Sequence, residues 1–165
     1  MIDNPPAKSG GRRRRSAGFS LIELLMVMGV LGIISTLAVG GFQNMVRDQR
    51  VRNCSFELYA SLTLARSEAI KRNADVTVSP AAGGWQNGWT IAASGTPLKT
   101  QARMNGITIT GGPASVVYNK SGRLPPAGLP PPAFQVVDTA ATSAYTRCLK
   151  IELSGMPRAA RGVCT

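Results

Sequence analysis

Few side chains in this sequence have the types and spacing that catalysis or metal binding requires. The 165 residues contain no histidine, which excludes a Ser-His-Asp triad, a histidine general base and a histidine metal site. The three cysteines form no CxxC pair, which argues against a zinc-thiolate site, and the scattered carboxylates suggest no acid–base couple. We therefore predict a protein that is not an enzyme and that needs no metal or cofactor.

One carboxylate stands in an unusual place. Glu23 is the only charged residue in the apolar run 19–42. A helix of about 20 apolar residues can cross the hydrocarbon core of a bilayer, so this run predicts a transmembrane helix. A carboxylate near the start of such a span is costly to bury and is by default a functional residue. Glu23 is therefore the first candidate site residue.

The segment 1–18 before this run is polar and basic. It contains Lys8 and the arginine run 12–15, and it has too little apolar surface to fold. These charges are expected to keep that end of the helix in the cytoplasm, with the chain after residue 42 across the membrane. A secretory signal peptide is the competing interpretation. Against it, the apolar run exceeds the roughly 7 to 15 residues of a signal core, and no clear Ala-x-Ala site follows.

The elements after the apolar run change character twice. No glycine or proline occurs over 44–79, and small or apolar residues recur every three or four positions, which predicts an amphipathic helix over 44–74 ending near Asn73. Its buried stripe is expected to be Val51, Ser55, Leu58, Leu62, Ala65 and Ala69. Beyond it, short β-branched runs between turn signals predict antiparallel sheets packed on the helix. The expected strands are 75–79, 88–93, 106–110, 115–118, 134–137, 148–153 and 161–164.

Two segments of this β region have expected roles of their own. Trp85 and Trp89 flank an Asn-Gly pair that predicts a hairpin turn, and we interpret the two indoles as packing groups rather than a stacking platform for a ligand. The proline-rich segment 124–132 is expected to be an irregular crossing loop, with a proline-rich ligand motif as the alternative.

The order of basic leader, Gly18, Phe19, Glu23 and apolar helix resembles the class III signal of type IV pilins and pseudopilins. The resemblance implies that a prepilin peptidase cleaves after Gly18, that Phe19 is methylated, and that the mature chain has 147 residues. Glu23 would then be neutralised by the N-terminal amine of a neighbouring subunit, since an opposite charge offsets much of the desolvation cost. The alternative is an ordinary single-pass anchor with an incidental glutamate.

Later segments resemble, more narrowly, the GspH/FimT (FimT/FimU-like) family of minor pilins and pseudopilins; they are 56–58, 62–73, 84–91 and 117–123. The family implies an α+β fold in which a long N-terminal helix packs on a C-terminal antiparallel β-sandwich. The corresponding regions here are 1–18, the cleaved leader; 19–43, transmembrane; 44–74, amphipathic helix; and 75–165, the globular domain.

That family also implies a place and partners. The chain would be held in the inner membrane with its C-terminal domain in the periplasm, and would then join other major and minor pilins in a filament. It would lie at or near the tip of a type IV pilus and prime assembly. A pseudopilus of a type II secretion system, without DNA binding, is the alternative.

Positive charge near the C-terminus suggests a further partner. The chain has 19 basic and 8 acidic residues. Without the leader, which holds five basic residues and one acidic residue, the net charge is +7.

Some FimT-like minor pilins bind DNA for natural transformation through a basic C-terminal segment. The candidates here are Arg147, Lys150, Arg158 and Arg161, on an expected exposed loop. Such a loop could hold phosphates of double-stranded DNA with little sequence preference. A solvated surface, or contact with a neighbouring subunit, is the alternative.

The cysteines fit an oxidising compartment outside the inner membrane. A disulfide between Cys148 and Cys164 would enclose 15 residues and pin the C-terminal hairpin. In the chain-entropy account it would stabilise the fold by about 3 kcal/mol. Cys54 is expected to be a packed free thiol on the helix, and its pairing with either of the other cysteines is the open alternative.

Overall fold

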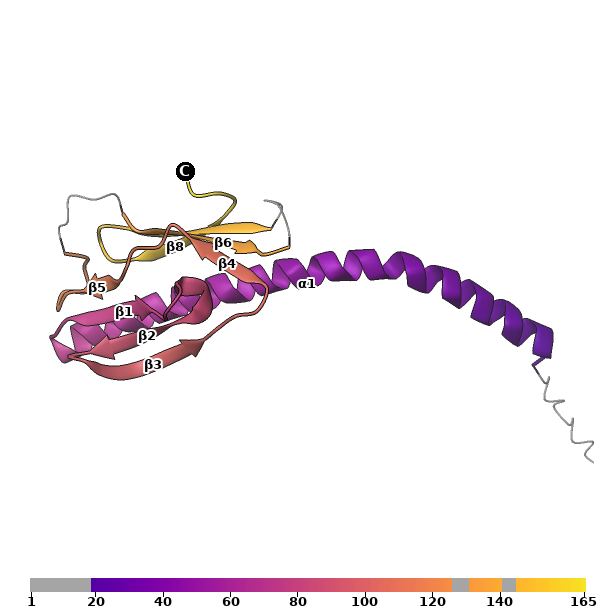
Figure 1. Ribbon diagram of the computed structural model, residues 1–165, viewed down its shortest axis with the longest axis horizontal. Coiled ribbons are helices and arrows are strands. Elements are labelled where there is room, and N and C mark those ends of the chain that lie inside the picture. Colours follow the sequence, from indigo (N-terminus) through magenta and orange to yellow (C-terminus); the bar gives the residue numbers. More distant parts are fainter. Residues whose placement is uncertain (1–18, 126–130, 141–144) are drawn as a thin grey trace, which may run out of the picture. The chain divides into compact units, whose positions relative to one another are not determined.

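The computed structural model describes residues 19–125, 131–140 and 145–165 (Figure 1). It divides into two compact units, Met1–Gly40 and Gly41–Thr165. A single helix, α1 (Leu21–Arg72), belongs to both. The leader 1–18, including Gly18, lies outside the described residues.

In the first unit, the side chains described over 19–36 are all exposed. The hydroxyls of Ser35 and Thr36 donate hydrogen bonds to the backbone carbonyls of Leu31 and Ile33, both at 2.7 Å. Such bonds satisfy the hydrogen-bonding capacity of the two hydroxyls within the helix itself. Among the described residues, neither Leu21–Thr36 nor Gly41–Arg72, the two stretches of α1 on either side of residues 37–40, has the length and hydropathy of a membrane span alone, but the two together have them.

In the second unit, α1 buries the predicted stripe. All six positions of the stripe are buried, five of them with no exposed surface and Ser55 with 3%. The helix ends as the sequence indicated, because Asn73 adopts a left-handed conformation with φ of 51°. The amide of Asn73 donates to the carbonyl of Ile70 and the amide of Ala74 to that of Ala69, both at 3.2 Å. This is the Schellman pattern of helix ends.

The described residues include eight antiparallel strands, which form two four-stranded sheets along the second half of α1 (Figure 1). One sheet has the order β3-β2-β1-β5, with bounds Thr96–Ala102, Gly88–Ala93, Val76–Pro80 and Val116–Tyr118. The other has the order β4-β6-β7-β8, with bounds Ile107–Thr110, Ala133–Asp138, Thr146–Ile151 and Pro157–Arg161. The predicted α+β class, a long helix on antiparallel sheets, is therefore confirmed.

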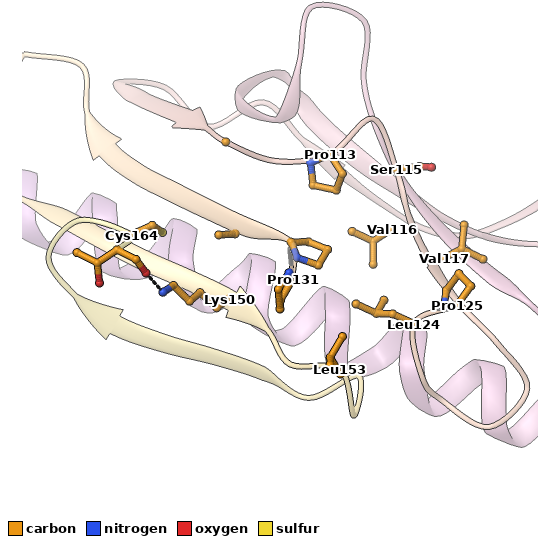
Figure 2. A pocket seen from close by; sticks show the side chains of 14 residues that line it. Pro113, Ser115, Val116, Val117, Leu124, Pro125, Pro131, Lys150, Leu153 and Cys164 are labelled. Carbon is orange, nitrogen blue, oxygen red and sulfur yellow. Dashed lines mark hydrogen bonds between the residues drawn. The ribbon is translucent and has the colours of Figure 1, made fainter. Parts of the chain in front are cut away.

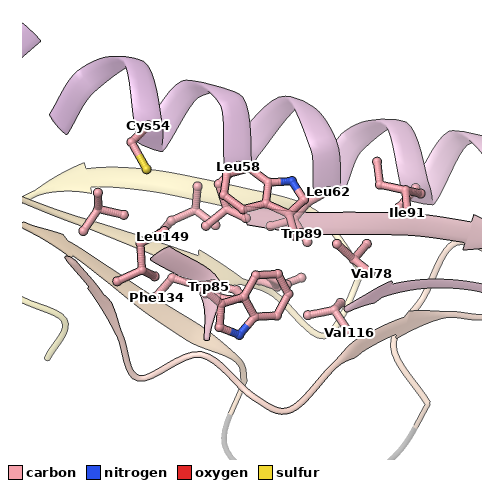
Figure 3. Packing of buried hydrophobic residues seen from close by; sticks show 14 of the residues in the cluster. Cys54, Leu58, Leu62, Val78, Trp85, Trp89, Ile91, Val116, Phe134 and Leu149 are labelled. Atoms are coloured by element: carbon pink, nitrogen blue, oxygen red, sulfur yellow. The ribbon is translucent and has the colours of Figure 1, made fainter. Parts of the chain in front are cut away.

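The core lies between α1 and the two sheets (Figure 3). Trp85 and Trp89 are both buried, at 4% and 1% exposure, which confirms their packing role. The ring of Trp85 meets that of Phe134 edge to face at 4.9 Å, and its Nε1 donates to the carbonyl of Pro113 at 2.8 Å. Large rings such as these bury much apolar area and so contribute strongly to the stability of the core.

One predicted turn was wrong, and one turn was missed. The Asn-Gly pair does not close a hairpin; Trp85–Asn87 forms a 3-10 turn and Gly88 begins β2. Strand β3 was not predicted, although Ser94 and Gly95, with φ of 48° and 81°, form the turn that leads into it. Positive φ at both central residues is typical of a two-residue hairpin, so Ser-Gly was the missed signal.

The last strand was also predicted in the wrong place. β8 is Pro157–Arg161 and not 161–164, so the expected basic loop is largely an edge strand. Proline is tolerated there because it is the first residue of the strand. The centre of the proline-rich segment, 126–130, lies outside the described residues.

Candidate functional site

The N-terminus of α1 contains the predicted assembly residue. Glu23 lies in the first turn of the helix and its side chain is exposed, as is Phe19 at 74%. The amides of Glu23 and Leu24 donate to the carbonyl of Ser20 at 3.1 and 3.2 Å, so the helix begins at once after Ser20. A carboxylate at this end is favoured by the helix dipole and is free to meet a positive group of another molecule.

The four basic candidates lie on β7 and β8, where the strand register arranges them in two pairs. Arg147 is opposite Arg161, and Lys150 is opposite Arg158. Arg147 shares its face of the sheet with Leu149 and Ile151, because side chains alternate along a strand and both are buried against the core. Lys150 and Arg158 therefore point from the opposite, outer face. The four residues do not form one cluster.

Both members of the outer pair have partners within the chain. Arg158 Nε lies 2.6 Å from Glu152 Oε1 in an exposed ion pair. The amine of Lys150 donates to the carbonyl oxygen of Thr165 (Figure 2). Exposed pairs of this kind are weak, so a stronger anionic ligand could replace them.

The inner pair lies near a carboxylate of α1. Asp48 accepts a hydrogen bond from Arg52 Nε at 2.9 Å and forms an ion pair with Arg52 Nη2 at 2.7 Å. This hydrogen bond is the main cause that holds the pKa of Asp48 below its usual value of 3.8, and the charges of Arg147 and Arg161 act in the same direction. Arg147 and Arg161 thus form one group of charges with Asp48 and Arg52 of α1.

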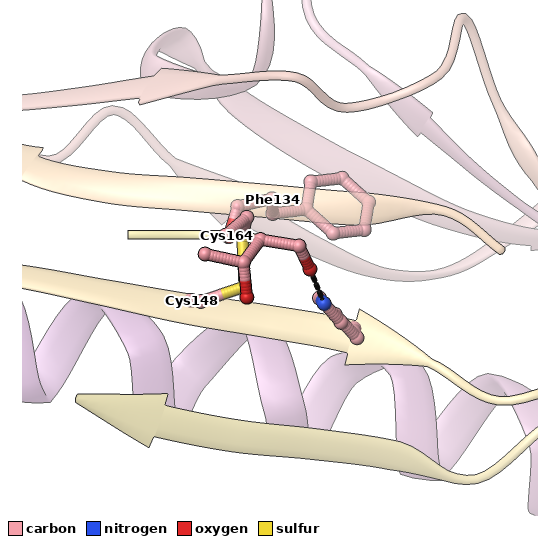
Figure 4. The surroundings of a disulfide bond; sticks show 5 residues. Phe134, Cys148 and Cys164 are labelled. Carbon is pink, nitrogen blue, oxygen red and sulfur yellow. Dashed lines mark hydrogen bonds between the residues drawn. A yellow bond between two sulfur atoms is a disulfide. The ribbon is translucent and has the colours of Figure 1, made fainter. Parts of the chain in front are cut away.

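The predicted disulfide joins Cys148 of β7 to Cys164 of the C-terminal tail, with 5.0 Å between the Cα atoms (Figure 4). It fixes the tail beside β6 and β7. Cys54 is a buried free thiol, as expected. Burial is the main cause that raises the pKa of Cys54 to about 12, and the charge of Glu57 adds to it.

An apolar pocket of about 700 Å³, which was not predicted, opens beside the tail (Figure 2). Prolines, valines and leucines make up most of its described lining, which also includes Lys150 and Thr165. Pro125 and Pro131 at the ends of the proline-rich segment also line it. The signal that could have suggested a groove here is this run of prolines, which cannot continue a sheet.

Comparison with known protein families decides the classification. The family model described as Type II transport protein GspH matches residues 57–155, which is more than half of the chain. The chain belongs to the GspH family. The model of the prokaryotic N-terminal methylation motif matches residues 13–39, the region of Gly18, Phe19 and Glu23. The GspH family is one of pilin-like structural proteins.

Solved structures of similar fold agree with this GspH assignment. A crystal structure of the type IV minor pilin FimU of Pseudomonas aeruginosa has a TM-score of 0.57 at 21% identity, covering 69% of this chain and 95% of that chain. A second crystal form of FimU has a TM-score of 0.56 at 22% identity, covering 66% and 91%. At this identity the likeness shows the fold. No curated protein matches the chain at a significant level.

Proposed function

We propose that this GspH-family chain is a minor subunit of a type IV pilus, anchored in the inner membrane before assembly with its β domain in the periplasm. The observation that carries the proposal is one combination: a methylation motif, an apolar helix with exposed side chains, and a GspH domain. Such a helix is unfavourable in water, so it needs a bilayer or the helices of other subunits around it.

Processing and assembly would use the residues around the start of the helix. Prepilin peptidase would cleave after Gly18 and methylate Phe19, which leaves a positively charged amine at the new N-terminus. In the filament, Glu23 would pair with the amine of a neighbouring major or minor pilin. Removing either partner leaves a charge unpaired among apolar helices, which is strongly destabilising. The pair would therefore set the register between subunits.

A place at or near the tip, with a role in priming assembly, is the finer part of the proposal. Its support is the fold, which is similar to that of FimU, described as a minor pilin. The test is deletion of the gene, with surface filaments and secreted proteins measured in the same cells. Loss of filaments with secretion intact supports the pilus. Loss of secretion with filaments intact supports a type II secretion pseudopilus, and no change in either overturns both.

Capture of double-stranded DNA is a second candidate function. The observation that favours it is the position of Lys150 opposite Arg158 on the outer face of an edge hairpin. Phosphate contacts from such a pair would be weak and strongly dependent on salt. The matched test compares duplex binding by the wild-type domain, by K150Q/R158Q and by R147Q/R161Q. Selective loss in K150Q/R158Q supports an outer-face site, and equal binding by all three removes it.

A further inference from the structure

Five arginines lie on the part of α1 that begins the second unit and on the edge hairpin near it, and we call them the arginine collar. Three come from the helix and two from the edge hairpin of the second sheet: Arg47, Arg50, Arg52, Arg147 and Arg161. Arg47 and Arg147 are half-buried, and the other three are exposed.

The collar occupies both flanks of the helix. Asp48 and Arg50 are two positions apart, hence about 200° around the helix axis. On one flank Arg50 lies beside the turn before β4, where a Cβ on Gly106 would be 3.2 Å from Arg50 Nη1. On the other flank Arg52 forms an ion pair with Asp48. The positive charges of Arg147 and Arg161 also lower the pKa of the Asp48 carboxyl.

The charge of the collar is only partly neutralised. Asp48 can balance one arginine, and its carboxylate is already engaged by Arg52. Asp138, at the end of β6, is buried at 4% exposure, and its Oδ1 accepts a hydrogen bond from the amide of Ala140. The collar therefore carries a net positive charge that an anionic surface could balance.

Exposed apolar side chains come immediately before the collar on the helix. Phe42 and Met45 are 68% and 71% exposed, and Phe42 lines a small hollow with Arg47 and Arg50. Arg47 and Arg50 follow Phe42 by five and eight residues, which is roughly 8 and 12 Å along a helix. Apolar and aromatic groups followed within two turns by arginines are typical of a membrane interface, where arginine stems lie along apolar surface and their guanidinium groups reach phosphates.

We propose that the arginine collar binds the headgroups of anionic phospholipids in the membrane that holds the helix. The inference rests on the membrane anchoring within the proposed function and goes beyond it, because it assigns the collar a lipid partner. The planar guanidinium group suits phosphate oxygens through paired hydrogen bonds. This contact would hold the β domain against the membrane until the subunit enters a filament.

The test uses the unit Gly41–Thr165, which contains the whole buried core and the disulfide and is therefore a folded part. Its binding to vesicles is measured by co-sedimentation, with phosphatidylcholine alone or mixed with phosphatidylglycerol. We expect binding only to vesicles that contain phosphatidylglycerol, weakened by high salt. Binding of equal strength to both kinds of vesicle would overturn the proposal, and so would no binding to either.

The chain offers a matched control on the same two strands. R147Q/R161Q removes two collar charges, and K150Q/R158Q removes two charges from the outer face. We expect R147Q/R161Q to weaken binding by about tenfold or more, since each basic residue near an anionic surface contributes roughly fivefold. K150Q/R158Q should bind nearly as the wild type. Equal loss in both variants would reduce the effect to net charge and overturn the proposal.

Two further measurements separate this inference from the other proposals. The mature chain, residues 19–165, should insert into both kinds of vesicle, and failure to insert in either would contradict the membrane anchoring itself. Duplex DNA should be bound equally by wild type and R147Q/R161Q. If this variant loses DNA and lipid binding in parallel, the collar is a general phosphate site and the lipid assignment fails.

Discussion

Arg147 and Arg161 lie directly opposite each other on β7 and β8, on the sheet face that also carries the buried Leu149 and Ile151. Lys150 is only three residues from Arg147, yet it points from the other face, because three is an odd number of steps along a strand. Basic residues that are close in sequence therefore belong to two different surfaces. The inner surface includes Asp48 of α1, and the outer surface carries Lys150, which contacts the tail at Thr165.

The charges around Asp48 predict a titration that can be measured. The pKa of its carboxyl is lower in the folded chain than the usual 3.8, mainly because Arg52 donates a hydrogen bond to it. Its contribution to stability is therefore present above that usual value and is lost as the pH falls through the lowered folded pKa. Carbon-detected NMR should show the Asp48 pKa rising in R52Q, and rising less in R147Q/R161Q. An unchanged pKa in R52Q would contradict the pairing.

Cys54 should be an unreactive thiol in the folded protein. Its raised pKa of about 12 means that almost no thiolate exists at pH 8, and the side chain is fully buried. A thiol reagent should therefore modify no cysteine in the native chain and one per chain after unfolding without reductant. Stability should fall from about pH 9 toward 12, because the folded state holds this proton more tightly than the unfolded state. Rapid modification of the native chain would contradict this.

Two glycines with nearly the same φ provide a matched test of packing. Gly155 and Gly95 have φ of 82° and 81°, but a Cβ on Gly155 would overlap the carbonyl oxygen of Gly122, whereas Gly95 has open space. Gly95→Ala should cost roughly 1 kcal/mol from the left-handed conformation alone. Gly155→Ala should cost clearly more, on the order of 3 kcal/mol, because backbone must also move. Equal midpoints of chemical denaturation for the two variants would refute the close approach.

The disulfide should contribute to the stability of the β domain. Replacing Cys148 and Cys164 together by serine should lower the free energy of unfolding by about 3 kcal/mol, as expected for a loop of this length. The comparison is urea denaturation of the double variant against the wild type, with Cys54→Ala as the control that leaves the disulfide intact. If the double variant is as stable as the wild type, the bond does not constrain the unfolded chain as this account requires.

Local patterns in the sequence determined what could be predicted. The buried stripe from Val51 to Ala69 was found because a helix repeats its faces within a few residues, and Asn73 marked the helix end by its own conformation. The distribution of the basic residues over two faces was not found, since it depends on the register of β7 with β8. Where a strand begins decides which face each arginine takes, and β8 began four residues before the predicted position.

Strand β3 and the turn before β2 were missed for a related reason. β3 contains Pro97 and Lys99 and is mostly exposed, so it lacks the apolar alternation of a half-buried strand. Gly88 was assigned to a hairpin turn, but its role is set by a neighbour distant in sequence: a Cβ there would overlap the carbonyl oxygen of Gln101 in β3. Tertiary contacts of this kind leave no signal at the residue itself.

The central claim is that this chain becomes a filament subunit with a processed N-terminus held by Glu23. The most direct measurement is mass spectrometry of the chain in the filament fraction sheared from cells that carry wild type or Glu23→Gln. We expect the wild-type chain in that fraction to begin with methylated Phe19. We expect the Glu23→Gln chain to be cleaved after Gly18 but to stay in the membrane, because the neighbour's amine loses its partner. A wild-type chain that keeps residues 1–18, or a Glu23→Gln chain equally abundant in filaments, would contradict it.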